Sequence, residues 1–326
     1  MLEDLYNKFW LSIDKMNQKR IAEKSYSTPP HISEKLGVKY GLDKEQYFDM
    51  FYPKSKANQK LPTIVHIHGG AYISGVKDLY TEYCQMLAQK GYCVINLEYI
   101  KGLRIGFPHP VFDFFKFYEF IEKNPEISSH IDFGNFLLSG DSSGGHVASL
   151  IANIQTNPSL KQKFELTGGP DVKGCILTCP MLGVYKFKGL WPKKRFEKLV
   201  YKDYYNTKYK DICHNLETIT NKFPPSIIIS ASNDFIKLHA YLYEKTAKKI
   251  DLSLEHYCVT SGKHLSHCSI MTYPQDPESQ IAHKKIQDFV EKVLNKKTKT
   301  GVISEKINKK TLKLEKQKSE EENLTL

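Results

Sequence analysis

Apolar runs and amphipathic segments alternate along most of this chain. The stretches TIVHIHGG (63–70) and YCVINLEYI (92–100) predict buried strands, and LYTEYCQMLAQKG between them predicts a helix that ends at Gly91. Further strands are predicted within 37–52 and at 135–140, 172–180, 225–232 and 252–259, and further helices at 109–124, 145–155, 239–250 and 277–294. Such alternation, with strands that are apolar almost throughout, indicates an α/β fold: a mostly parallel central sheet with helices on both faces.

Three segments do not follow this alternation. Residues 1–36 have apolar positions near helical spacing, which predict one or two helices, and the insert at about 183–222 is polar and rich in aromatic residues. We expect both segments to form a helical cap over one edge of the sheet, which belongs to a main domain of residues 37–294. The charged, low-complexity stretch 295–326 is predicted to be a lone helix or a disordered tail.

Composition narrows the class of protein. Hydrophobic residues make up 40% of the 326 positions, as in globular proteins, and no run of about 18 uncharged apolar residues predicts a membrane span. The N-terminus carries early acidic residues and lacks the apolar core of a signal peptide. The seven cysteines are odd in number and form no CxxC pair, which argues against a disulfide framework and a zinc site and favours a reducing, cytoplasmic location.

The formal net charge is +11, and nine lysines and five glutamates within residues 295–326 supply +4 of it. No nucleic-acid-binding motif accompanies this charge, so we expect no nucleic-acid partner. A basic surface leaves peripheral contact with an anionic membrane open, although a lysine-biased composition is the simpler interpretation. The oligomeric state is not encoded in any pattern of this kind.

The stretch FLLSGDSSGGHVASL (136–150) holds the first candidate chemistry. Its Gly140-Asp141-Ser142-Ser143-Gly144 fits G-x-S-x-G, and it lies between a predicted strand and a predicted helix. Such a turn holds the serine in a strained backbone conformation, and the N-terminus of the following helix favours a developing negative charge. A glycine turn with no chemical role is the alternative, but this context favours Ser142 as a nucleophile.

A second glycine-containing segment, His68-Gly69-Gly70-Ala71, ends an earlier strand. An enzyme that transfers acyl groups needs two or three N–H donors aimed at the oxyanion of the tetrahedral intermediate. Glycine lets the backbone approach closely enough to supply them. Because this segment lies one strand–helix–strand unit before G-x-S-x-G, it is a candidate oxyanion loop.

The motifs HGGAYISG and GDSSGG, with FPHPVFDFFKFYEFI between them, resemble the hormone-sensitive-lipase and arylacetamide-deacetylase branch of the α/β-hydrolases over roughly residues 60–294. The resemblance implies the α/β-hydrolase fold, a carboxylesterase-type serine hydrolase with a helical cap, and no metal or cofactor. It also implies that the oxyanion hole is formed by the amides of Gly69 or Gly70, Ala71 and Ser143.

The sequence departs from that branch at two places. Ala71 stands where a third glycine is usual, and it still offers an N–H. Glu98-Tyr99-Ile100 replaces an Asp-Tyr-Arg triplet, so we expect a buried ion pair of the relatives to be missing, with an effect on the cap or loops rather than on catalysis.

A serine nucleophile needs a base and an acid that orients it, and in this fold the chain order is Ser, acid, His. Asp234 follows a predicted strand at the end where α/β sites are built, and Asp203 and Asp251 are worse placed. Two histidines follow the last strand. The spacing from Asp234 favours His264, whereas the similarity of the segment up to the final helix favours His267, which we prefer; His264 stays the alternate.

The predicted function is hydrolysis of carboxylic esters with short to medium acyl chains through a Ser-His-Asp triad and an acyl-enzyme, acting on a small-molecule substrate. Hydrolysis of amides or N-formyl groups is the first alternative, and a non-catalytic protein that binds a ligand under its cap is the second. Residues of the insert are expected to shape the acyl pocket: Trp191, Lys193, Lys194, Arg195, Tyr201, Tyr204 and Tyr205.

Overall fold

The computed structural model describes residues 27–102, 104–182 and 193–324, together with positions 8, 12, 15, 19, 21 and 22. A nine-stranded sheet forms its centre, in the order β1-β2-β4-β3-β5-β6-β7-β8-β9. Strands β1 and β2 pair antiparallel with their neighbours, and every pairing from β4 to β9 is parallel. The strands are β1 (Ile32–Lys39), β2 (Tyr47–Pro53), β3 (Leu61–Ile67), β4 (Cys93–Leu97), β5 (Ile131–Asp141), β6 (Val172–Thr178), β7 (Ser226–Ala231), β8 (Ser253–Val259) and β9 (Gly301–Ile307).

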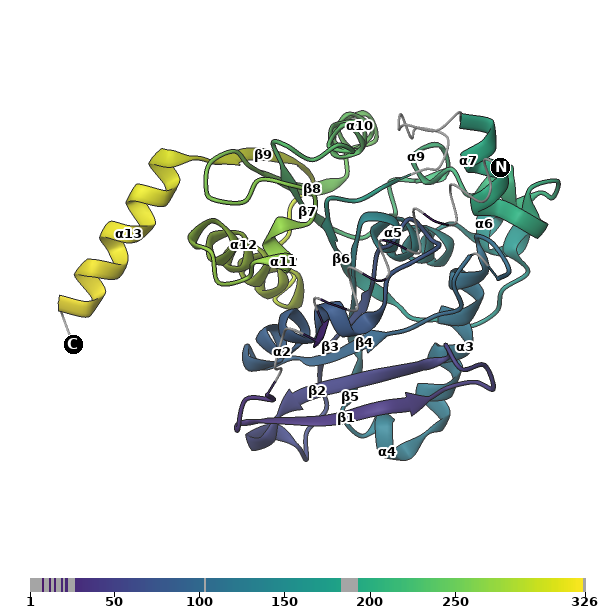
Figure 1. The fold of residues 1–326 in the computed structure, drawn as a ribbon, viewed down its shortest axis with the longest axis horizontal. Helices are drawn as coiled ribbons and strands as arrows, with labels where there is room; N and C mark the ends of the chain where they lie inside the picture. The colour runs from purple at the N-terminus through teal and green to yellow at the C-terminus, as the bar shows by residue number, and fades with distance from the viewer. Residues whose placement is uncertain are drawn as a thin grey trace.

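Helices cover both faces of this sheet (Figure 1). They are α2 (Thr81–Gln89), α3 (His109–Lys123), α4 (Pro125–Ser128), α5 (Ser142–Thr156), α6 (Pro158–Phe164), α7 (Lys193–Tyr201), α8 (Tyr209–Ile212), α9 (Asn215–Thr218), α10 (Leu238–Lys249), α11 (Ser269–Thr272), α12 (Pro277–Leu294) and α13 (Lys309–Leu324). Short 3-10 helices η1 (Lys54–Lys56), η2 (Lys77–Tyr80) and η4 (Lys202–Tyr204) complete the described elements.

Each face has its own hydrophobic core. Along β5, Phe136 and Leu138 pack in the core with α3, α5 and α10, whereas Leu137 between them packs in the core with α2, α11 and α12. A strand with two buried faces must be apolar at consecutive positions, which explains the near-continuous apolar runs of the sequence. The predicted mostly parallel α/β sheet with helices on both faces is confirmed.

The described part of the predicted cap insert consists of α7, η4, α8 and α9. It contacts α5, because Asn215 bonds to Asn153 and the Cys213 carbonyl oxygen lies 2.9 Å from His146 Nε2. The insert positions 183–192, with Trp191, lie outside the described residues. So does most of the predicted N-terminal pair of helices, of which the six described positions before residue 23 are helical. The prediction is wrong for residues 32–36, which belong to strand β1 and pair with β2.

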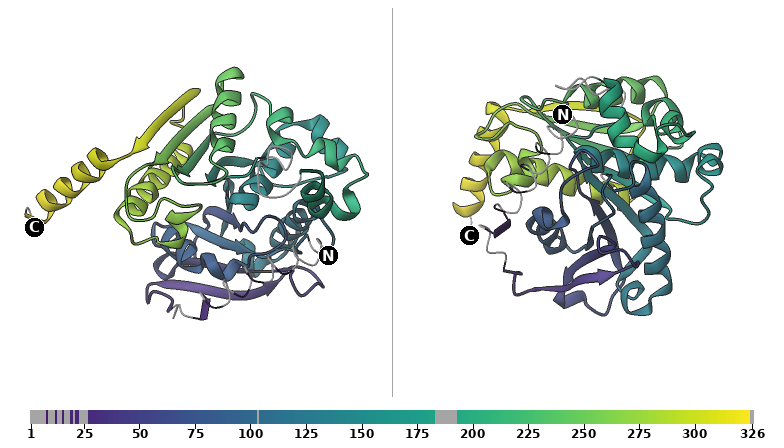
Figure 2. Two further views of the ribbon diagram at one scale, coloured as in Figure 1. Left: turned by 45° about the horizontal axis from the view of Figure 1, so that its top comes forward. Right: turned by 45° about the vertical axis from the view of Figure 1, so that its right-hand side comes forward.

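The C-terminal segment differs from the prediction of a lone helix or disordered tail. Residues 301–307 form β9, which pairs in parallel with the full length of β8, and only the following α13 projects from the body (Figures 1 and 2). The sequence of β9, GVISEKI, shows a polar centre because the strand lies at the sheet edge and four of its residues are exposed. Its last residue, Ile307, is buried in the core beside α12.

Deletion of residues 300–326 is therefore expected to destabilise the fold. Loss of a buried isoleucine alone costs roughly 2 kcal/mol, and removal of β9 also uncovers the backbone groups of β8. We expect the thermal unfolding midpoint to fall by roughly 5 °C or more, with increased aggregation, in differential scanning calorimetry and light scattering. Deletion of residues 315–326 alone keeps β9 and should leave the midpoint nearly unchanged; equal losses in both variants would contradict this role of β9.

Among the described helices, none combines the length and the apolar character needed to cross a bilayer.

Candidate active site

Ser142 stands at the junction of β5 and α5, as the first residue of the helix. Its φ is +50°, in the left-handed region that L residues rarely adopt. The glycines on each side explain why this turn can form. A Cβ on Gly144 would lie 2.1 Å from the carbonyl oxygen of Ile67, and a Cβ on Gly140 would lie 2.5 Å from that of Gly144. The sharp strand–turn–helix predicted for this motif is therefore present.

His267 and Asp234 are hydrogen-bonded partners, with 2.8 Å between His267 Nδ1 and Asp234 Oδ1. Asp234 follows β7, and its Oδ1 also accepts the backbone N–H of Ile236 at 2.9 Å. The carboxylate is buried, and its Oδ2 has no hydrogen-bond partner among the residues that the structure describes. A buried carboxylate bonded to Nδ1 fixes the ring orientation and leaves Nε2 as the proton acceptor.

The loop that carries His267 lies against the Ser142 turn. The next residue, Cys268, points its Sγ at Asp141 Oδ2 over 3.5 Å, and Asp141 immediately precedes Ser142. Burial lowers the pKa of His267, but hydrogen bonds with Asp234 and Cys179 outweigh burial and raise that pKa above its usual 6.5. Both partners favour the imidazolium, which is the form that a general base takes after it accepts a proton.

His264, the alternate base, has a different partner. Its Nδ1 lies 2.5 Å from Asp276 Oδ2, and its ring stacks on Tyr273 with 3.7 Å between ring centroids. Its backbone N–H donates to Glu278. The structure thus brings His267, and not His264, to Asp234.

The four predicted oxyanion-hole residues fall into two groups. The Gly69 N–H donates to Asp141 Oδ1 at 2.8 Å, so this amide is already bonded. For the amides of Gly70, Ala71 and Ser143, no partner is found within the described ranges. Ala71 has φ +53°, and a Cβ on Gly70 (φ +129°) would lie 1.9 Å from the Ser74 carbonyl oxygen, so this loop is tightly folded and needs glycine at position 70.

Asp141 is a residue of this region to which the sequence analysis gave no role. Its carboxylate accepts hydrogen bonds from the Gly69 N–H and from the Tyr80 hydroxyl at 2.8 Å each. Burial raises its pKa. These bonds tie the glycine loop to the Ser142 turn, and the return bond from the Tyr72 N–H to Ser143 Oγ, at 3.1 Å, does the same. The signal in the sequence was the acidic residue inside G-x-S-x-G.

The expected loss of a buried ion pair at Glu98 is wrong. Glu98 is fully buried and lies 2.8 Å from His68 Nε2 and 2.9 Å from Lys101 Nζ. Lys101, one position beyond the replaced triplet, supplies the cation that the triplet lacks. Burial raises the pKa of Glu98, but His68 and Lys101 outweigh it and hold the pKa at about 2. Since His68 adjoins Gly69, this cluster anchors the base of the candidate oxyanion loop.

This pKa predicts a loss of stability in acid. A folded-state pKa of about 2, against the usual 4.5, stabilises the fold above pH 4.5, and the contribution disappears as the pH falls from about 4.5 to 2. Urea unfolding gives the free energy of unfolding at each pH between 7 and 3. At pH 7 this free energy should be up to about 3 kcal/mol lower for Glu98→Gln than for the wild type, and it should fall less steeply as the pH decreases. Glu119→Gln removes an exposed pair with Lys123 and should follow the wild-type curve, since solvent screens that pair. Parallel curves for wild type and Glu98→Gln would contradict the assignment.

The aromatic residues of the insert take unequal positions. Tyr201 is fully buried against Phe107, with 5.8 Å between the ring centroids, so it is a core residue and does not line an open pocket. Tyr204 is half-buried and packs on Phe112 and Tyr209. The pocket role predicted for Tyr205 stays a prediction, and the side chains of Lys193, Lys194 and Arg195 lie outside the described part of the structure.

A family model described as BD-FAE matches residues 48–236, which is more than half of the chain. The chain belongs to the BD-FAE family of α/β-hydrolases. This BD-FAE chain is 21% identical over 300 residues to Probable carboxylesterase 7 of Arabidopsis thaliana, a match that covers 82% of the chain and 91% of that protein. It is 23% identical over 274 residues to 2-hydroxyisoflavanone dehydratase of Glycyrrhiza echinata, with 74% and 80% covered. Two other Arabidopsis thaliana relatives, Probable carboxylesterase 5 and Carboxylesterase 20, are matched over only 34% and 48% of their lengths.

Solved structures show the same fold. Esterase B from Lactobacillus rhamnosis, in a crystal structure with a tributyrin phosphonate, superposes with a TM-score of 0.80 at 22% identity, covering 89% of this BD-FAE chain and 94% of that chain. A bacterial heroin esterase gives a TM-score of 0.63 at 21% identity, with 87% and 89% covered. The predicted α/β-hydrolase fold is confirmed.

Proposed function

We propose that this protein is a serine carboxylesterase that cleaves small carboxylic esters through an acyl-enzyme on Ser142. The observation that carries the proposal is the pairing of His267 with the buried Asp234, on a loop that lies against the strained turn of Ser142. A strained serine beside a histidine oriented by a buried carboxylate is the arrangement that nucleophilic acyl transfer requires. Relatives named carboxylesterases support the same activity.

Each residue then has one role. Ser142 Oγ attacks the ester carbonyl carbon while His267 Nε2 takes the hydroxyl proton, and Asp234 stabilises the imidazolium. Collapse of the tetrahedral intermediate expels the alcohol, which takes its proton from His267. Water then attacks the acyl-enzyme by the same route and regenerates Ser142.

The amides of Gly70, Ala71 and Ser143 are the proposed oxyanion donors, each worth about 3 kcal/mol of barrier. Gly69 leaves the predicted set because its N–H is bonded to Asp141. Asp141 positions the donors: it holds the glycine loop against the first turn of α5, whose free N–H groups also favour the oxyanion.

Short to medium acyl chains are the proposed substrate range. Esterase B from Lactobacillus rhamnosis, the structural neighbour above, is described with a C4-C4 SN3 tributyrin phosphonate and, in a second structure, as C6-C4 SN3 inhibited. Amide and N-formyl hydrolysis use the same residues, and nothing in the site favours them over esters.

A fluorophosphonate with a short alkyl chain tests the proposal directly. We expect one covalent adduct per folded chain, mapped by peptide mass spectrometry to Ser142, and no adduct on Ser142→Ala or on urea-unfolded protein. A parallel series of nitrophenyl esters from acetate to decanoate, beside an aryl acetamide, should show turnover that is greatest for the shorter esters and weak for the amide. An unlabelled, inert folded protein would refute the enzyme and leave a ligand-binding role; faster turnover of the acetamide would reassign the bond cleaved.

A further inference from the structure

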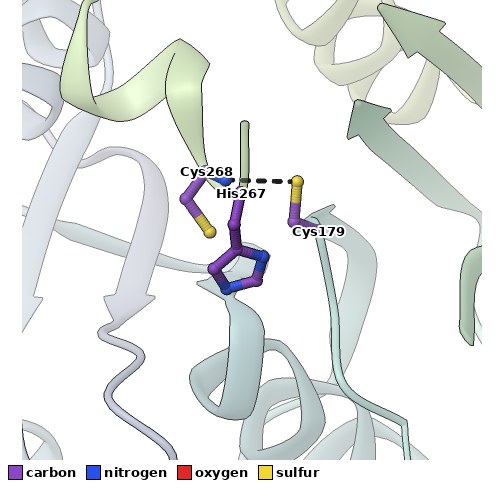
Figure 3. Close-up of side chains that lie close together, drawn as sticks. All are labelled: Cys179, His267 and Cys268. Atoms are coloured by element: carbon purple, nitrogen blue, oxygen red, sulfur yellow. Dashed lines mark hydrogen bonds between the residues drawn. The ribbon is translucent and has the colours of Figure 1, made fainter. Parts of the chain in front are cut away.

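Three potential metal ligands meet beside the proposed base. One ligand atom from each of Cys179, His267 and Cys268 lies within 4.8 Å of those of the other two (Figure 3). Cys179 directly follows β6, and His267 and Cys268 lie in the loop between β8 and α11. The two cysteines are 89 positions apart in the sequence, and the Cys268 N–H donates to Cys179 Sγ at 3.4 Å.

The backbone holds both thiols in place. Cys179 has φ +43° and Cys268 has φ +54°, conformations that are unfavourable for residues with a Cβ. The two side chains pack with Ala231 in a small buried cluster. Both buried thiols are therefore carried by backbone in an unfavourable conformation, next to each other.

We propose that Cys179, His267 and Cys268 form a binding site for Zn²⁺ or a similar thiophilic ion, which blocks the base when it is occupied. Two sulfur ligands and one imidazole suit zinc, and the set contains no carboxylate that would favour magnesium or calcium. A tetrahedral zinc ion, with about 2.3 Å to sulfur and about 2.0 Å to nitrogen, separates its ligand atoms by roughly 3.5 Å. The present spacing within 4.8 Å therefore needs a contraction of about 1 Å.

Asp234 lies beside the histidine of this ligand set, 2.8 Å from His267 Nδ1. When Nε2 takes the metal, Asp234 is the carboxylate partner that zinc-bound histidines usually have.

Occupancy of the site has a consequence for catalysis that rests on the proposed function. A metal bound through Nε2 uses the lone pair that would take the proton of Ser142, and a metal bound through Nδ1 leaves the ring proton on Nε2. In both cases His267 cannot act as base, so hydrolysis should stop until a chelator removes the ion. Metal binding itself does not depend on turnover, and it can be measured without any substrate.

Cobalt(II) serves as the spectroscopic probe for the full-length protein kept reduced with a phosphine. We expect one Co²⁺ per chain with a thiolate-to-cobalt charge-transfer band in the near ultraviolet, abolished by one equivalent of Zn²⁺. The single variants Cys179→Ser and Cys268→Ser should weaken binding at least tenfold, and the double variant should show no band. Cys93→Ser is the matched control, since it removes a buried thiol at the opposite end of the strands, beside Thr63.

Ester hydrolysis provides the second measurement, with each variant compared with its own metal-free rate. Stoichiometric Zn²⁺ should inhibit the wild type and Cys93→Ser more than tenfold, reversibly by EDTA, and should leave the double variant at its metal-free rate. Absence of the cobalt band, or an equal band in the double variant, would overturn the metal site even if the enzyme hydrolyses esters. A cobalt band in a protein that never hydrolyses esters would retain the site and refute the proposed function.

Discussion

His267→Ala is expected to lower kcat/KM for a short nitrophenyl ester by about 10⁵-fold, whereas His264→Ala should lower it less than tenfold. The reason is that Asp234 is bonded to His267 at 2.8 Å, while His264 is bonded to Asp276 and stacked on Tyr273. Without His267, nothing takes the proton of Ser142, and the residual rate comes from substrate binding and the oxyanion hole. Steady-state kinetics on the two variants and the wild type measure this difference.

The two variants also differ in stability, which separates catalysis from folding. His264→Ala removes a stacked ring and its bond to Asp276. We expect it to lower the thermal unfolding midpoint while kcat/KM stays within tenfold of the wild type. The near-ultraviolet circular dichroism of His267→Ala should match that of the wild type. A large loss of kcat/KM in a folded His264→Ala, with an active His267→Ala, would exchange the roles of the two histidines.

The architecture could be predicted because burial on both faces forces a recognisable pattern. All five residues of β4, Cys93–Leu97, are buried, and the strand is apolar at every position except Asn96; likewise, the sequence predicts α12 over the 277–294 range that it occupies. The Ser142 turn could be predicted for a related reason: backbone atoms approach Gly140 and Gly144 so closely that no Cβ fits there. These features depend on local constraints, which a sequence records directly.

Three details could not be predicted, two of them because they depend on contacts between segments far apart in the sequence. Edge strand β9 is exposed at four positions, so its polar residues look like a tail until β8 is seen beside it. Glu98 appeared to lack a cation because its partner, Lys101, lies just outside the motif used for comparison. The bond from the Gly69 N–H to Asp141 spans 72 positions, and no local pattern shows that this amide is occupied.

The choice between His264 and His267 shows the same limit within one loop. The histidines are three residues apart, and the spacing from Asp234 and the spacing to the last helix favoured different ones. The loop conformation decides, because it turns each ring toward a different carboxylate, Asp234 or Asp276. The metal-ligand cluster follows from this same loop, since it brings Cys268 to Cys179.

Asp234→Asn is expected to lower kcat/KM by about 10⁴-fold with little change in the fold. The amide keeps the size of the carboxylate, and its oxygen can still accept the Ile236 N–H that now goes to Asp234 Oδ1 at 2.9 Å. What it loses is the negative charge beside His267, so the imidazolium formed during attack by Ser142 is no longer stabilised, and the amide can also select the wrong ring tautomer.

Asp276→Asn is the matched control for this substitution. It makes the same chemical change in the other carboxylate–histidine pair of the loop, where Asp276 faces His264, and it should change kcat/KM less than threefold. The comparison therefore isolates which pair performs the proton transfer, since each variant loses one carboxylate that is bonded to a histidine of the same loop. Equal effects of the two variants would mean that loop integrity, and not the Asp234–His267 pair, limits the reaction. A near-wild-type rate for folded Asp234→Asn would remove Asp234 from the proposed triad.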